Sequence, residues 1–243
     1  TAVINAVPLS SRAAFGGIWT DANTNEVVMR LIRTTQVGGR IGSIFRGVSA
    51  NLNNIGVVTW KPSDKLWNSY DQVNDIRFSS YLRSEPLLTA AGRQPRLVFK
   101  YWGTGLATTN ENVNNGKVFR SAEMFLIRAE ARAEQNRVSG ANSAESDLNT
   151  LRAARITGYV NETFASKDAV VTAIIEERFK ELPYEGHRFF DLKRRGLPVQ
   201  RLMSDVPNAS AVTLPANNFR FSLPIPQVEM LANPLMVQNA GYQ

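Results

Sequence analysis

Apolar residues recur at helical spacing from residue 121 to residue 182. Within residues 121–135 they stand three and four positions apart, which predicts an amphipathic helix. The same spacing returns in residues 144–155, after a short turn rich in Ser, Gly and Asn. Small residues on both faces allow the two helix axes to approach closely, so we expect one antiparallel hairpin of the tetratricopeptide kind, without visible tandem repetition. Its apolar positions are Ala122, Phe125, Leu126, Ala129, Ala133, Ala144, Leu148 and Leu151.

A third helix is predicted to begin after Ser166, whose hydroxyl can accept a hydrogen bond from the free amides of the first turn. Its apolar positions continue to Leu182, and Pro183 interrupts it because proline lacks the amide hydrogen of a helix interior. Gly186 permits a turn into a short helix over residues 187–195. The tail from Pro207 has no helical period and is expected to be extended.

The first 118 residues show weaker patterns. A short helix near residues 14–19, capped by Ser10 or Ser11, and a helix over residues 63–70 are predicted, with strands over residues 26–32 and 96–102. Residues 34–59 form a long stretch of Gly, Asn, Ser and Thr, which is typical of a functional surface loop. We therefore expect a loop-rich, ligand-facing portion over residues 1–118 and a helical portion over residues 119–243, both within one domain.

Composition narrows the class of protein. The 243 residues are 43% hydrophobic and 20% charged, which is ordinary for a globular chain that buries a sizeable core. There is no cysteine, no signal-peptide pattern and no apolar run of the length of a membrane span. The formal charge of +7 raises the question of nucleic acid. The basic residues are spread along the chain, however, and the densest run, residues 193–195, suits the end of a helix. Nucleic-acid binding is not expected.

The most charged segment is residues 174–196. A metal site there would need converging ligands, but the chain has a single histidine, and neither a metal nor a cofactor is expected. Carboxylates beside Arg178, Arg188 and Arg194 are expected to form ion pairs, which lower carboxyl pKa values and make poor general acids. We therefore expect a structural network and no enzyme activity. The side chains considered are Glu177, Glu181, Glu185, His187 and Asp191.

Aromatic residues suggest a binding surface. Sugars present C–H faces to aromatic rings and hydroxyl groups to Asn and Arg, so a loop that holds Phe45, Arg46, Asn51 and Trp60 has suitable chemistry. Trp102, at the end of a predicted strand, joins these four as a candidate ligand-binding residue. The alternative interpretation, aromatic residues that anchor a loop on the core, is at least as good for any one of them.

Four segments, in the right order along the chain, resemble the C-terminal half of the SusD/RagB family. Residues 119–134, followed by residues 147–155, resemble its alanine-rich repeat hairpin. Residues 175–195 (IEERFKELPYEGHRFFDLKRR) resemble its diagnostic stretch E-R-x-x-E-L-x-x-E-G-x-R-x-x-D-L-x-R. Residues 221–242 (FSLPIPQVEMLANPLMVQNAGY) resemble its closing motif, and residues 8–28 are similar to its linker into a short helix and strand. Over residues 1–118 the similarity is weaker.

The resemblance implies a mainly α fold, a tetratricopeptide-like helical superhelix with long irregular loops and a few short strands. It also implies a protein on the extracellular face of the outer membrane that binds an oligosaccharide, or a peptide, without altering it. The partner would be a SusC-like TonB-dependent transporter. Family members are about twice as long, and most carry a lipid anchor on a cysteine that this chain lacks. The chain, which begins at Thr1, is therefore expected to be a fragment whose membrane attachment and N-terminal half are missing.

Two other functions stay open at this point. A helical-repeat adaptor for protein partners would show the same hairpin, and a glycoside hydrolase would use some of the same carboxylates. Binding of unchanged sugar, capture of a soluble protein, or turnover of a polysaccharide would distinguish the three.

Overall fold

The computed structural model describes residues 1–34, 41–45, 58–103 and 113–242, and the chain forms two compact units. Unit 1 runs from Thr1 to Pro183 and unit 2 from Tyr184 to Gln243. The division expected between residues 118 and 119 falls inside a strand of unit 1, β4 (Gly116–Arg120). Among the described residues, no helix combines the length and the apolar character that crossing a membrane requires.

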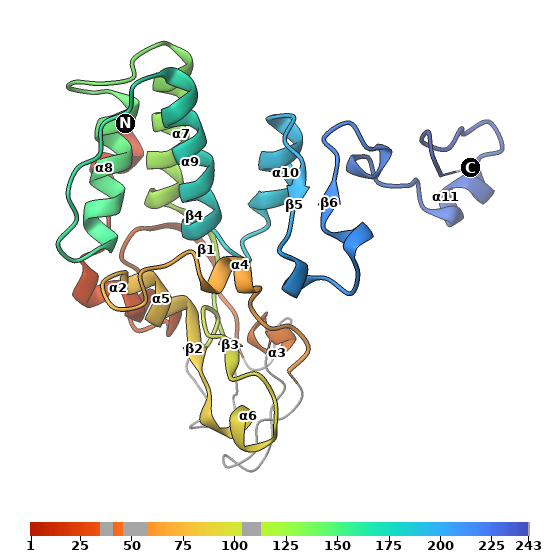
Figure 1. Ribbon diagram of the computed structural model, residues 1–243, viewed down its shortest axis with the longest axis horizontal. Coiled ribbons are helices and arrows are strands. Elements are labelled where there is room, and N and C mark those ends of the chain that lie inside the picture. The colour runs from red at the N-terminus through yellow and green to blue at the C-terminus, as the bar shows by residue number, and fades with distance from the viewer. Residues whose placement is uncertain (35–40, 46–57, 104–112, 243) are drawn as a thin grey trace. The chain divides into compact units, whose positions relative to one another are not determined.

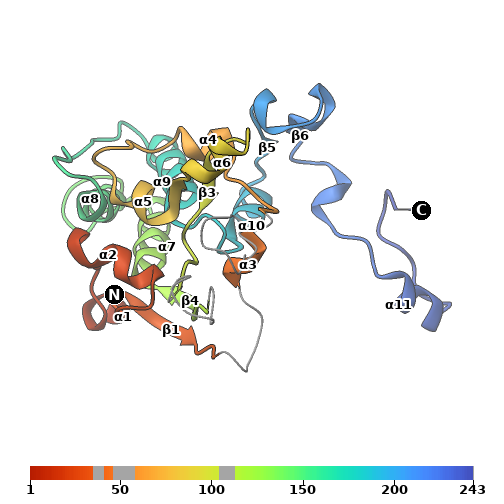
Figure 2. The same cartoon turned by 90° about the horizontal axis from the view of Figure 1, so that it is seen from below.

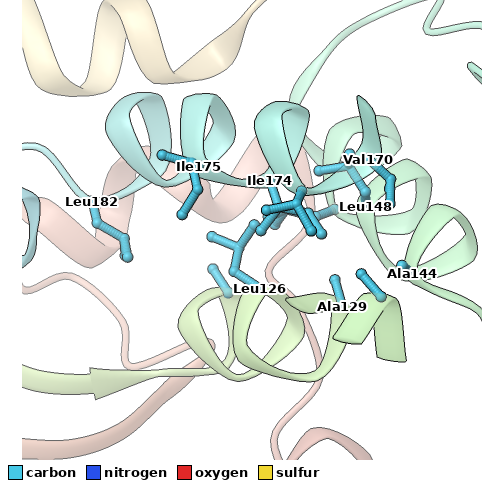
Figure 3. Packing of buried hydrophobic residues seen from close by; sticks show 12 residues of the cluster. Leu126, Ala129, Ala144, Leu148, Val170, Ile174, Ile175 and Leu182 are labelled. Atoms are coloured by element: carbon cyan, nitrogen blue, oxygen red, sulfur yellow. The ribbon is translucent and has the colours of Figure 1, made fainter. Parts of the chain in front are cut away.

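Unit 1 is built on three helices, α7 (Ser121–Glu134), α8 (Ala144–Arg155) and α9 (Lys167–Glu181), which stand side by side in Figure 1. Both α8 and α9 contact α7. Their facing sides bury a continuous apolar cluster in which alanines alternate with larger side chains (Figure 3). Alanine at Ala129, Ala133 and Ala144, each fully buried, lets the backbones approach closely. The predicted hairpin is confirmed.

Local sequence sets the ends of these helices. The hydroxyl of Ser166 accepts a hydrogen bond from the amide of Ala169 at 3.1 Å, as predicted. Ser143 and Ser146 form a reciprocal capping box at the start of α8. Of the two serines considered for α2 (Arg12–Trp19), Ser11 is the cap, because its hydroxyl accepts from the amide of Ala14. α9 ends before Pro183, as expected.

Short elements surround the three helices. α2 and α5 (Ile76–Tyr81) lie side by side, as the view from below also shows (Figure 2). Strand β1 (Val27–Leu31) pairs with β4 and strand β2 (Leu82–Ser84) with β3 (Arg96–Val98), both antiparallel. The other short helices of unit 1 are α1 (Ala2–Ala6), α3 (Ile41–Phe45), α4 (Asp64–Trp67) and α6 (Pro86–Ala90).

The second predicted strand is shorter than expected. It was predicted over residues 96–102, but β3 ends at Val98. The amides of Phe99 and Lys100 both donate to the carbonyl of Tyr81, and the amide of Trp102 donates to the carbonyl of Phe99. The chain therefore turns after Val98, and this turn brings Phe99 and Trp102 together.

Unit 2 has little regular structure. It contains α10 (His187–Arg194), a two-stranded ladder of β5 (Val199–Gln200) and β6 (Thr213–Leu214), three 3-10 turns and α11 (Gln227–Ala232). Phe189 stacks on Phe221 with ring centroids 5.5 Å apart. The tail was predicted to be extended throughout, which is wrong for α11. This helix of six residues is too short to display a hydrophobic period.

Candidate functional site

An arginine and two aromatic rings gather where β2 and β3 pair. Arg83 lies on β2 opposite Leu97, and its guanidinium carbon is 5.6 Å from the ring centroid of Phe99 and 5.9 Å from that of Trp102. The two ring centroids are 4.6 Å apart. The Arg83 side chain is 47% exposed, and both rings are partly exposed. We call Arg83, Phe99 and Trp102 the arginine–aromatic cluster. It offers ring surface and hydrogen-bond donors together.

Trp60 is the most exposed of the predicted binding residues that the structure describes. It is 61% exposed and makes no ring contact with the described residues. The segment before it is held by Arg93, whose guanidinium donates to the carbonyl of Val58 at 3.5 Å. Trp60 is thus available to a ligand rather than enclosed in the core, and its binding role stays a prediction.

The other predicted residues have different surroundings. The Phe45 ring stacks on Tyr101, with centroids 6.0 Å apart and planes 10° apart, and Tyr101 meets buried Trp19 edge-on. These contacts favour the alternative interpretation for Phe45, an aromatic residue that anchors its segment on the core. Arg46 and Asn51 lie outside the described residues.

Sequence reasoning missed Arg83 and Phe99. Arg83 lies in a strand of three residues, too short for an alternating pattern to mark its exposed face. The run Phe99, Tyr101 and Trp102 was a usable signal, but it was interpreted as strand. The rings of Phe99 and Trp102 meet because the chain turns there, whereas Tyr101 packs on Phe45 and Trp19.

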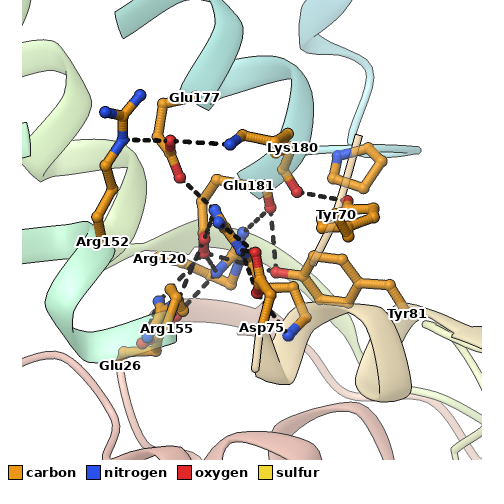
Figure 4. A network of polar contacts seen from close by, with 12 residues as sticks. Glu26, Tyr70, Asp75, Tyr81, Arg120, Arg152, Arg155, Glu177, Lys180 and Glu181 are labelled. Carbon is orange, nitrogen blue, oxygen red and sulfur yellow. Dashed lines mark hydrogen bonds and ion pairs between the residues drawn. The ribbon is translucent and has the colours of Figure 1, made fainter. Parts of the chain in front are cut away.

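Two glutamates of α9, Glu177 and Glu181, lie in a buried network of charged residues (Figure 4). One oxygen of Glu181 accepts from Arg120 at 3.0 Å and from Arg155 at 3.1 Å, and the other accepts from Arg77 at 3.2 Å. Glu177 pairs with Arg77 and, at 2.7 Å, with Arg152. With Glu26 and Asp75, the network has four carboxylates and four guanidinium groups: Glu26, Asp75, Glu177, Glu181, Arg77, Arg120, Arg152 and Arg155.

The partners of Glu177 and Glu181 differ from those expected. The sequence suggested arginines of the same segment, but the observed ones come from α5, from β4 and from α8. Within the segment, Arg194 and Asp191 do pair, at 2.9 Å. The network joins four elements of unit 1, which is the arrangement expected of residues that stabilise the fold.

The lowered pKa values of Glu177 and Glu181 agree with a structural role for these two residues. Burial alone raises the pKa of Glu177, but attraction to Arg77, Lys180 and Arg152 outweighs it and lowers the pKa to about 2. Burial also acts to raise the pKa of Glu181, and attraction to Arg155, Arg120 and Arg77 holds it well below its usual range. Carboxylates that stay ionised and fully hydrogen-bonded cannot donate a proton near neutral pH. The hypothesis that these residues are structural rather than catalytic is consistent with this geometry.

We predict a specific acid sensitivity. A depressed carboxyl pKa adds stability that is fully present above the unfolded value near 4.5 and is lost as pH falls through the folded value near 2. Stability should be level from pH 8 to about pH 5 and then fall, with a contribution from Glu177 of about 3 kcal/mol. Urea unfolding followed by circular dichroism at each pH measures this. Glu177→Gln should reduce the fall, whereas Glu176→Gln, an exposed change on the same helix, should not. Equal pH profiles for the two variants would contradict the assignment.

Comparison with known proteins gives independent evidence about the family of this chain. The model of the family described as the SusD family matches residues 92–242, which include Phe99 and Trp102 but not Arg83 or Trp60. A curated relative, the SusD-like protein P2 of Formosa agariphila, is 33% identical over 175 residues, or 67% of this chain and 33% of that protein.

Solved structures share the fold. A SusD superfamily protein of Bacteroides thetaiotaomicron matches 95% of this chain and 52% of its own, with a TM-score of 0.74 and 25% identity. Surface glycan-binding protein A of the same organism, solved with laminarihexaose, matches 98% of this chain and 57% of its own, with a TM-score of 0.71 and 20% identity. The chain spans about half the length of these structures and a third of the curated relative.

Proposed function

Because the chain belongs to the SusD family, we propose that it binds an oligosaccharide at the outer cell surface and passes it, chemically unchanged, to a SusC-like TonB-dependent transporter. The predicted resemblance is confirmed by the family match, and the predicted mainly α fold by the solved structures that share it. The chain would contribute ligand contacts from unit 1.

The observation that carries the proposal is the exposed aromatic surface of unit 1. Trp60 is 61% exposed, and the partly exposed rings of Phe99 and Trp102 stand beside the donors of Arg83. Aromatic faces pack against the C–H faces of sugar rings, and donors beside them can bind hydroxyl groups. The laminarihexaose complex of a protein with the same fold supports carbohydrate as the ligand class.

The first test is direct. The chain should be retarded in native gels that contain a polysaccharide it binds, and the oligosaccharide should be recovered with its mass unchanged. Release of new reducing ends would favour a glycoside hydrolase. Retention of a peptide with no retention of any sugar would favour the peptide ligand. Co-purification with a co-expressed SusC-like transporter tests the delivery step.

We predict that Trp60→Ala weakens binding about tenfold. A stacked aromatic ring is worth about 0.5–1.5 kcal/mol beyond its buried area, and the exposed Trp60 ring has that surface available. Calorimetry with the glycan that gives the strongest gel retardation measures the effect, with circular dichroism as the folding control. Trp60→Phe keeps a ring and should retain most of the affinity. Unchanged affinity in Trp60→Ala would exclude Trp60 as a contact.

A further inference from the structure

We infer that the glycan bound at the arginine–aromatic cluster is anionic, with carboxylate or sulfate groups, and that Arg83 is the residue that selects its charge. The inference rests on the proposed function and narrows its ligand class. It starts from the contacts of Arg83 itself. The guanidinium lies over Phe99 and Trp102, and in the described part of the chain no side chain or carbonyl accepts a hydrogen bond from it.

The nearest carboxylate, Glu85, forms only a long ion pair with Arg83. Glu85 lies 3.9 Å from the Arg83 Nε, beyond hydrogen-bond distance, and is itself buried. The oxygen that faces Arg83 is Oε2, and the other oxygen, Oε1, accepts from the amide of Leu87, at 3.5 Å, at the start of α6. The N–H groups of a guanidinium form a planar fork that matches the two oxygens of a carboxylate or sulfate. Arg83 is therefore only weakly paired with Glu85 among the described residues, and its half-exposed N–H groups can bind a further anion.

The neighbouring rung of the same ladder provides an internal comparison. Arg96, opposite Ser84, also lies over an aromatic ring, with its guanidinium carbon 5.0 Å from the centroid of Trp67. Its guanidinium is bonded to Asp64, so its charge is compensated within the fold. The same arrangement of an arginine beside a ring thus occurs twice, once with a hydrogen-bonded carboxylate and once with a carboxylate 3.9 Å away.

The charge of the residues around the arginine–aromatic cluster also favours an anionic ligand. Residues 82–103 contain four basic residues and one acidic residue, a net charge of +3 (4 − 1). Lys100 is buried against the rings of Trp19 and Tyr81 and donates to backbone carbonyls, so it is structural. Arg83 and Arg93 are exposed. Trp60 likewise has exposed cations beside it, Lys61 in sequence and Arg93 through the carbonyl of Val58.

The arginine–aromatic cluster and Trp60 thus each have an exposed cation nearby, and no carboxylate among the described residues accepts a hydrogen bond from Arg83, Arg93 or Lys61. Neutral sugars can use the rings and some of the donors. An acidic sugar also neutralises the charge, and it gains more because the ring contacts partly shield the guanidinium from water. The attraction should weaken as salt concentration rises, since a half-exposed pair is screened.

The test compares charged and uncharged ligands in affinity gels and by calorimetry. The anionic probes are polygalacturonate, alginate and a sulfated galactan. The neutral probes are laminarin and fully methyl-esterified polygalacturonate, which has the polygalacturonate backbone without its charge. We expect at least one anionic probe to bind at least tenfold more tightly than the neutral ones at low salt. Binding to neutral probes only would overturn the inference and leave the proposed function standing, whereas no binding of any glycan would overturn both.

Variants identify the residue. Arg83→Gln should lower affinity for the anionic probe at least tenfold and change affinity for a neutral probe less than twofold. Arg83→Lys keeps the charge but not the planar fork, so its affinity should lie in between. Arg137→Gln makes the same charge change at an exposed site after α7, and its affinity should stay within twofold of that of the parent chain.

Equal weakening of anionic and neutral binding by Arg83→Gln would indicate a merely structural role, and no change would exclude Arg83. Preferential binding of an acidic peptide would also overturn the inference.

Discussion

Glu181→Ala is expected to destabilise the chain by about 3–5 kcal/mol, a large part of the stability of an ordinary domain. The substitution removes a carboxylate that is fully buried and bonded to Arg77, Arg120 and Arg155. The three guanidinium groups would then stay buried, away from water, with fewer hydrogen-bond acceptors. Urea unfolding of the whole chain, monitored by circular dichroism, measures the loss.

The matched control is Glu176→Ala, an exposed glutamate on the same helix. It makes the same chemical change outside the network and should alter stability by no more than about 0.5 kcal/mol. If Glu181→Ala were as stable as this control, the network would not hold unit 1 together. If it folded normally and lost only ligand binding, Glu181 would have to be reassigned to function.

Leu126→Ala is expected to cost about 2–5 kcal/mol. Leu126 is fully buried between α7 and its neighbours α8 and α9, in a cluster already rich in alanine. Because the adjacent small side chains cannot extend into the space, most of the cavity would remain. The measurement is the midpoint of urea unfolding.

Ile127→Ala serves as the control on the same helix. Ile127 is 47% exposed and lies outside the apolar cluster, and alanine favours the helical backbone more than isoleucine does. Its cost should stay below about 1 kcal/mol. Similar losses for the two variants would mean that the cluster around Leu126 is not the main core of unit 1.

The core and the network together explain how the candidate site is held. Arg77 belongs to α5, which leads directly into β2, the strand of Arg83. Tyr81, the last residue of α5, makes two further contacts. Its hydroxyl donates to the carbonyl of Glu181 at 3.1 Å, and its backbone carbonyl accepts from the amide of Phe99. The start of the ladder is therefore attached to the end of α9. A weakened network should loosen the arginine–aromatic cluster as well as lower stability.

The sequence by itself determined the elements whose signals are local. The helical period of residues 121–182, the cap at Ser166 and the break at Pro183 depend on neighbours within a few positions, and the structure agrees at each. The family motifs are local in the same sense, so the resemblance could be identified without coordinates. The exposed position of Trp60 suits a role that the sequence suggested, although binding remains to be tested.

Only the tertiary structure decided which distant groups meet. Glu181 was expected to pair within its own segment, but Arg120 and Arg155 lie 61 and 26 positions away, and Arg155 also reaches Glu26 across 129 positions. Arg83 and Phe99 came together through a turn after Val98 that the strand pattern did not reveal. The physical reason is common to both. An ionised or aromatic side chain can pair with many partners of suitable chemistry along the chain, and packing of the whole unit selects one of them.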